Sequence, residues 1–191
     1  MIPAWNLQGI IPPVRPGATG SDPDRSPYKV PLHVFVDGMA NSAERLEIAE
    51  GLLQLRSQIH RLGITTGFQW LDGSFLENVE ATEGRSPRDI DVVTFFEIPA
   101  GETETSLVAK NPQLFDHAHV KETFRVDSYW DVLGMPMSPA AIQQVAYWHS
   151  MWSHRRDGVW KGFVQVDLDA MQDPLAAQAI AATKAAFGVT P

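Results

Sequence analysis

Hydrophobic residues recur along the chain with two spacings, one typical of helices and one typical of strands. In residues 42–62, leucine, isoleucine and alanine return every three or four positions, which predicts an amphipathic helix. Ser42 precedes this stripe and Gly63 follows it, and both residue types are favoured at the corresponding ends of helices. Residues 138–152 and 173–187 are also predicted to be helices, because each opens with a polar residue followed by proline.

Strands are predicted where apolar residues form short runs or alternate with polar residues. These segments are residues 67–72, 89–98, 119–127 and 160–168. The segment "PLHVFVDGM", residues 31–39, fits either a short strand or a turn of helix. The pattern as a whole predicts an α/β (α+β) fold, with a small mixed β-sheet flanked by helices.

The chain has 191 residues, which is enough for one domain with a substantial core. Residues 1–31 are rich in proline and have no regular hydrophobic pattern, so we expect an N-terminal arm that either lies over the domain or is loose. Residues 32–191 would then form a single domain that ends with the alanine-rich helix at 173–187.

Composition narrows the classes of protein to consider. The chain has no cysteine, which excludes disulfides and thiolate metal sites and fits a cytoplasmic location. Its first residues lack the basic start and apolar core of a signal peptide, and no stretch approaches the ~20 apolar residues of a membrane helix. The formal net charge of −8 argues against a surface that coats nucleic acid.

The strand predicted at 89–98 begins with two carboxylates. Residues two apart in a strand project from the same face, so Asp89 and Asp91 should point together while Ile90 and Val92 enter the core. At ~4 Å and an effective dielectric constant of ~20, two such charges repel by about 4 kcal/mol. A cation between them, or a proton on one of them, relieves this repulsion. Oxygen ligands without cysteine favour a hard ion such as Mg²⁺ or Mn²⁺.

Gly73 and Ser74 directly follow the strand predicted at 67–72. Glycine allows backbone amides to approach a ligand closely, and a helical turn after it would direct its N-terminus towards a phosphate. A phosphate-holding turn beside a paired-aspartate metal site is what phosphoryl or nucleotidyl transfer requires.

The order of strand, Gly-Ser, loop and Asp-hydrophobic-Asp resembles the polymerase-β-like nucleotidyltransferase superfamily. More closely, "WLDGSFLEN…SPRDIDVVTFF" is similar to an uncharacterised group of short bacterial nucleotidyltransferase-like proteins. The resemblance spans residues 40–168, and its specific part is residues 70–96. It implies a nucleotidyltransferase-like fold and a metal-dependent transfer of a nucleotidyl group from a nucleoside triphosphate to an unknown acceptor. That acceptor could be a protein hydroxyl, a small molecule or the end of an RNA.

The resemblance also implies roles for individual residues. Gly73 and Ser74 would bind the phosphates of the nucleotide, and Asp89 and Asp91 would bind Mg²⁺ or Mn²⁺. Asp127 would be the third carboxylate, which completes the metal site or accepts the proton of the attacking hydroxyl. Asp116 and Asp131 are alternatives to Asp127 for this role.

A departure from the resemblance supports a second hypothesis. Many small relatives carry an arginine after Gly-Ser, but here Glu77 and Glu80 follow. Acids beside a triphosphate need compensating bases, and the candidates are Arg85, Arg88, Arg155, Arg156 and Lys161. The alternative is therefore a catalytically inactive module that senses a nucleotide or binds a protein partner, as in toxin–antitoxin or phage-defence pairs.

Plainer interpretations apply to the other polar patterns. Asp89 and Asp91 could simply be solvated acids at a strand entrance of a structural protein. Asp167 and Asp169 are expected on a solvated strand face, and a zinc site at His117 and His119 would need a third ligand, so an exposed loop is favoured. A metal site is not expected from the remaining histidine pair, His149 and His154.

Overall fold

The computed structural model describes residues 1–134 and 136–188, so residues 189–191 of the predicted domain lie outside the described residues. The sheet has the strand order β1-β5-β2-β3-β4. Its strands are β1 (Tyr28–Lys29), β2 (Gly67–Asp72), β3 (Ile90–Phe96), β4 (Val126–Val132) and β5 (Val164–Asp167). Strand β2 runs antiparallel to β3 and β5, whereas β3 and β4 are parallel, as are β1 and β5. The predicted mixed sheet is confirmed.

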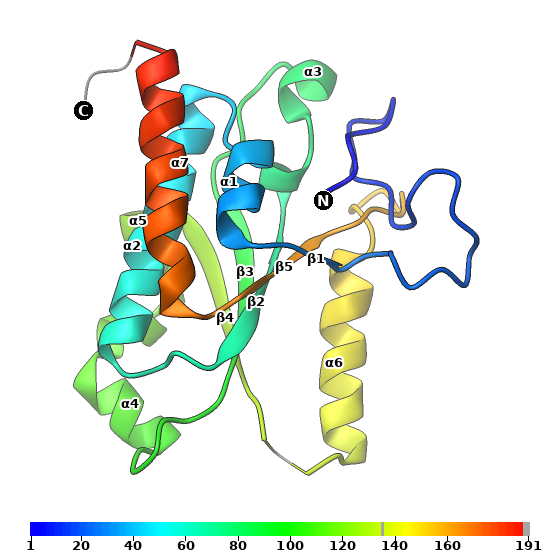
Figure 1. The fold of residues 1–191 in the computed structure, drawn as a ribbon. Coiled ribbons are helices and arrows are strands. Elements are labelled where there is room, and N and C mark those ends of the chain that lie inside the picture. Colours follow the sequence, from blue (N-terminus) through cyan, green and yellow to red (C-terminus); the bar gives the residue numbers. More distant parts are fainter. Residues whose placement is uncertain (135, 189–191) are drawn as a thin grey trace.

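Helices cover both faces of this sheet. Three single turns of 3₁₀-helix are η1 (Ser74–Leu76), η2 (Pro112–Phe115) and η3 (Ala170–Gln172). The α-helices of the described residues are α1 (Leu32–Met39), α2 (Ala43–Arg61), α3 (Val79–Glu83), α4 (Glu104–Lys110), α5 (His117–Phe124), α6 (Pro139–Trp152) and α7 (Asp173–Ala186). Helices α1, α2 and α7 gather on one side of the sheet, and α6 stands on the other (Figure 1). The α+β fold class predicted from the sequence is therefore confirmed.

The three long helices form where their caps and apolar stripes predict them. The side chain of Ser42 accepts a hydrogen bond from Arg45 N at the start of α2, and Ser138 accepts one from Ala141 N at the start of α6. The stripe of α2, including Leu46, is fully buried in the core beneath the sheet. Each such leucine stabilises the fold by roughly 1.5–3 kcal/mol through burial alone.

The opposite face of the sheet is lined by aromatic residues that support α6. The ring centroids of Trp70 on β2 and Phe163 lie 5.2 Å apart, and Trp152 of α6 packs edge-on against Phe163 at 6.0 Å. Trp148 extends this cluster towards Tyr129 of β4, with 5.0 Å between the ring centroids. Aromatic packing therefore holds α6 over this face.

The N-terminal arm lies over the domain. Ile10 and Ile11 are buried, and Tyr28 belongs to β1 at the edge of the sheet. Trp5 Nε1 donates a hydrogen bond to Leu76 O at 2.7 Å, which ties the arm to the segment after β2. The arm thus helps to fix the loop that carries the Gly-Ser pair.

The prediction of a strand at residues 119–127 is wrong. A helix, α5, occupies His117–Phe124, and β4 begins only at Val126. Asp116 caps the helix by accepting a hydrogen bond from His119 N, and Arg125 ends it in the left-handed conformation with φ 56°. The apparent alternation hides helical spacing, because Val120 and Phe124 are four residues apart and both pack against the core.

A smaller difference concerns the last strand of the sheet. The strand predicted at 160–168 is shorter and covers only Val164–Asp167. A turn precedes it, with Gly158 at φ 83° and an isolated bridge between His154 and Trp160. Within the described residues, no helix combines the length and apolar character needed to cross a membrane.

Candidate functional site

Three aspartates form a row across three neighbouring strands. Asp72 of β2 is the register partner of Asp91 of β3, and Asp91 is the register partner of Asp127 of β4. Register partners project from the same face, so their carboxylates share one side of the sheet. We call Asp72, Asp91 and Asp127 the acidic row. Asp89 is the residue immediately before β3 and lies beside the acidic row.

The two faces of β3 separate as predicted. Ile90 and Val92 are fully buried on the core side. Asp91 lies between them and projects from the other face, as a member of the acidic row. The structure therefore brings Asp89, Asp91 and Asp127 together. The alternatives to Asp127 lie elsewhere. Asp116 caps α5, and Asp131 is the register partner of Phe95, four residues beyond Asp127 on β4.

A lysine and a histidine from α5 contact the β4 end of the row. Lys121 Nζ lies 2.9 Å from Asp89 Oδ2 and 2.5 Å from Asp127 Oδ2. His117 Nε2 contacts the other oxygen of Asp127, Oδ1. The two side chains are four residues apart, so one face of the helix presents both of them to the acids.

A second lysine closes the β2 end of the row. Lys161 Nζ lies 3.1 Å from Asp72 Oδ1 and 2.8 Å from Glu77 Oε1. The side chains of Lys161 and Asp72 are each 5% exposed and that of Glu77 is 11% exposed. This end is therefore a buried ion-pair network, in contrast to the half-exposed side chain of Lys121.

The row perturbs the acidity of its members. Burial raises the pKa of Asp91 to about 6, and the negative charges of Asp127 and Asp89 add to this effect. Burial also raises the pKa of Asp72 to about 7, partly offset by Lys161. Burial disfavours the charged form of Asp127 too, but hydrogen bonds from Lys121 and His117 outweigh it and keep the pKa of this carboxyl below its usual value. Crowded carboxylates of this kind are typical of functional sites.

Gly73 places the backbone directly against Asp91. Its φ of 84° and ψ of −170° belong to a region that is essentially restricted to glycine. A Cβ at this position would lie 2.8 Å from Asp91 Oδ2, closer than real contacts. Ser74 follows as the first residue of η1 and is partly exposed. The predicted Gly-Ser pair is therefore next to the predicted aspartates.

Buried basic residues neutralise the two glutamates that follow the Gly-Ser pair. Arg45 of α2 is fully buried, its guanidinium pairs with Glu80 at 2.7 Å, and it donates to Glu77 O at 2.6 Å. The carboxylate of Glu77 pairs with Lys161. Glu77 and Glu80 therefore hold the loop in place, and basic side chains compensate their negative charges. Of the compensating bases considered from the sequence, Lys161 pairs with Glu77 at 2.8 Å, and Arg155 lies 4.0 Å from the other oxygen of Glu77.

The carboxylate oxygens of the site suit a hard divalent cation, although the described residues form no ready-made metal site. Among residues 1–134 and 136–188, no three histidine, aspartate or glutamate side chains already surround a metal position. The ammonium of Lys121 lies between Asp89 and Asp127 instead. The oxygen donors of these acids and of Asp91 match the preference of Mg²⁺ and Mn²⁺. Burial, and then the neighbouring charges of Asp127 and Asp89, raise the pKa of Asp91, and a positive charge nearby would oppose both effects.

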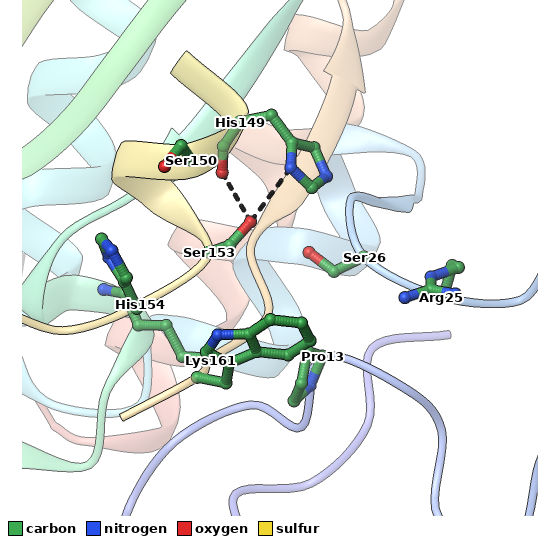
Figure 2. A pocket seen from close by; sticks show the side chains of 9 residues that line it. Pro13, Arg25, Ser26, His149, Ser150, Ser153, His154 and Lys161 are labelled. Carbon is green, nitrogen blue, oxygen red and sulfur yellow. Dashed lines mark hydrogen bonds between the residues drawn. The ribbon is translucent and has the colours of Figure 1, made fainter. Parts of the chain in front are cut away.

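A pocket of about 240 Å³ is formed between the N-terminal arm, the end of α6 and Lys161 (Figure 2). Ser153 and His149 of its wall come from the end of α6, with 3.2 Å between Ser153 Oγ and His149 Nδ1. Its lining residues are Pro13, Arg25, Ser26, His149, Ser150, Ser153, His154, Trp160 and Lys161. The pocket therefore adjoins the side chain of Lys161, whose amine pairs with Asp72.

Sequence reasoning missed Asp72 and Lys121, and it did not foresee that His117 and Lys161 contact the acids. Asp72 had a signal, since it is the last strand residue before Gly73 and therefore lies at the same sheet end. The i, i+4 spacing of His117 and Lys121 would have shown a shared face had the segment been assigned to a helix. Lys161 carried no local signal for contact with Asp72, because 89 positions separate the two residues.

A family model matches residues 3–167, and its description is a family of unknown function, DUF6932. The match covers more than half of the chain. The chain belongs to the DUF6932 family. The part shared with DUF6932 begins in the arm, includes the whole acidic row and both lysines, and stops before α7. No curated protein and no solved structure matches the chain.

Proposed function

We propose that the protein is a metal-dependent nucleotidyltransferase that uses a nucleoside triphosphate. The observation that carries this proposal is the register of Asp91 with Asp127, next to the close approach of Gly73 to Asp91. This arrangement combines acidic metal ligands with a turn at which backbone can approach phosphates. The sequence resemblance at residues 70–96 points to the same chemistry.

The residues of the site divide the work as follows. Gly73 and Ser74 bind and orient the phosphates. Asp89, Asp91 and Asp127 would hold a divalent cation, which would reduce the negative charge that the attacking group must approach. The acceptor hydroxyl attacks the α-phosphorus, pyrophosphate leaves, and Asp127 accepts the proton of the hydroxyl.

Transfer can be tested with α-labelled nucleoside triphosphates and Mg²⁺ or Mn²⁺. The wild-type protein should label itself, added RNA or a small-molecule acceptor, and Asp89→Asn/Asp91→Asn should lose the label at least about 100-fold. The chain offers a matched control in Asp167→Asn/Asp169→Asn, which has the same spacing on an exposed strand end. Equal labelling by both double variants, or none by the wild type, contradicts the proposal.

The structure also favours a second candidate, a catalytically inactive module that senses a nucleotide or binds a protein. Lys121 already compensates the negative charges of Asp89 and Asp127, and His117 contacts Asp127 as well. Helix α6 also exposes Ile142, Val145 and Tyr147, which are each more than half exposed. Such a module should still bind its nucleotide or partner in calorimetry when Asp89 and Asp91 are both replaced by Asn.

A further inference from the structure

Lys121 lies between two carboxylates of the acidic site and pairs with both of them. Its ammonium lies 2.9 Å from Asp89 Oδ2 and 2.5 Å from Asp127 Oδ2, so it bridges two of the three carboxylates assigned to the cation. The oxygens that face Lys121 are therefore not free for another ligand while it stays there. His117 takes the remaining oxygen of Asp127.

We propose that Lys121 is an internal counterion of Asp89 and Asp127 and that it leaves them when a divalent cation binds. This inference rests on the proposed function, since it assumes that these carboxylates bind a cation. It makes Lys121 a positioning residue that sets the affinity and order of ligand binding.

Exposure and location make Lys121 able to move. Its side chain is 43% exposed and rises from α5 at the surface, so its flexible stem can turn into solvent. Lys161 at the other end of the row is 5% exposed and is held by Asp72 and Glu77 together. A cation that enters the row can therefore displace Lys121, but not Lys161.

Displacement has a consequence for the nucleotide. Once released, the ammonium of Lys121 remains tethered beside Asp127 by the helix that carries it. Triphosphate oxygens that approach the cation would then meet this second positive charge. Binding of metal together with nucleotide should therefore be favoured over binding of metal alone, because the triphosphate replaces the carboxylates as the partner of Lys121.

Removal of the competing charge provides the test. In Lys121→Met the side chain stays unbranched, becomes one heavy atom shorter and loses its charge. Mn²⁺ should therefore bind about tenfold more tightly than to wild type, as measured by calorimetry or by loss of the electron paramagnetic resonance signal of free Mn²⁺. Lys184→Met is the matched control, because Lys184 forms a comparable pair with Glu50 on another surface and its loss should leave Mn²⁺ affinity unchanged.

The outcomes separate this inference from the proposed function. If wild type binds Mn²⁺, Asp89→Asn/Asp91→Asn does not, and Lys121→Met binds no more tightly than wild type, the role of Lys121 is refuted and the metal site stands. If neither wild type nor Lys121→Met binds Mn²⁺, both proposals fail. Tighter binding by Lys121→Met alone supports both.

A second measurement uses the wild-type protein and so does not depend on the folding of a variant. Lysine acylation by a water-soluble ester, read by peptide mass spectrometry, should increase severalfold at Lys121 when Mn²⁺ is added, because the amine is no longer held between two carboxylates. Acylation at Lys184 provides the internal reference. An unchanged ratio at Mn²⁺ concentrations that saturate the site overturns the proposal.

Discussion

The two ends of the acidic row carry the same kind of ion pair in opposite surroundings. At the β2 end, Lys161 joins Asp72 and Glu77 in a network in which every side chain is at most 11% exposed. At the β4 end, Lys121 joins Asp89 and Asp127 with 43% of its side chain exposed. Asp91 lies between the two ends and contacts neither lysine closely enough to form an ion pair.

The difference shows how burial assigns roles to chemically similar groups. A buried charge that loses its partner is left without solvent to replace it, so the Lys161 network is fixed in place. An exposed lysine can exchange its carboxylates for water at small cost, so Lys121 is replaceable. The β2 end therefore anchors the Gly-Ser turn through Glu77, and the β4 end is the end at which we propose that a cation enters.

The largest expected effect comes from breaking the buried end. Lys161→Met should lower the free energy of unfolding by about 3–5 kcal/mol, because Asp72 and Glu77 stay buried without a partner. Urea denaturation monitored by tryptophan fluorescence measures this change. Lys184→Met is the control, and a loss below about 1 kcal/mol for Lys161→Met would show that the burial of this network does not decide its role.

Asp91, in the middle of the row, should lower the stability of the folded protein when it is ionised, because neither Lys121 nor Lys161 pairs with it. The pKa of Asp91 rises from 3.8 to about 6 on folding, so the folded protein binds this proton more tightly than the unfolded chain. Stability should therefore fall as pH rises from about 4 to about 6, by about 3 kcal/mol at most. Asp91→Asn cannot ionise and should be more stable than wild type at pH 8 by about 2–3 kcal/mol.

Urea denaturation at pH 5 and pH 8 checks the direction of this change in stability with pH. The advantage of Asp91→Asn over wild type should shrink at pH 5, where more wild-type Asp91 is protonated. Asp167→Asn, which removes an exposed carboxyl paired with Lys29, should show no such pH-dependent gain. A variant less stable than wild type at both pH values would mean that the charged form of Asp91 is well compensated in the fold.

A smaller effect is expected where the backbone meets Asp91. Gly73→Ala should cost about 2 kcal/mol, because alanine is strained at φ 84° and its Cβ would press on Asp91 Oδ2. Gly84→Ala is the matched control, since Gly84 has φ 65° but no atom within 4 Å of an added Cβ. Thermal denaturation compares the two, and only Gly73→Ala should also weaken Mn²⁺ binding. Equal behaviour of both variants would remove Gly73 from the site.

Most of the fold is predictable from local signals. The helices at 42–62, 138–152 and 173–187 follow from caps, proline positions and apolar spacing, and the strands at 67–72 and 89–98 from apolar runs. The failure at residues 119–127 has a physical cause, since a short segment with two apolar residues four apart satisfies helix and strand patterns alike. The packing of α5 against α2 and β4 decides the outcome, and local sequence does not encode that contact.

The site is predictable only as far as its residues are close in sequence. Asp89, Asp91, Gly73 and Ser74 belong to one short motif, and their proximity follows from one hairpin-like pairing of β2 with β3. Asp127 reaches the row through the crossover from β3 to β4. The spacing of the residues in the sequence does not determine the register of this strand pair. Lys161 and Lys121 are placed by tertiary packing, so their pairing with the acids emerges only from the structure.

The smallest expected effect concerns the exposed end and sharpens the contrast most. Lys121→Met should lower the free energy of unfolding by about 1 kcal/mol or less, since the pair is exposed and water replaces it. Saturating Mn²⁺ should then reverse the order of the two proteins. If the variant binds Mn²⁺ about tenfold more tightly, mass action stabilises it by ~1.4 kcal/mol more than wild type. Urea denaturation with and without Mn²⁺ measures both values. A loss as large as that of Lys161→Met, or no change of order with Mn²⁺, would make the two ends of the row equivalent structural ion pairs.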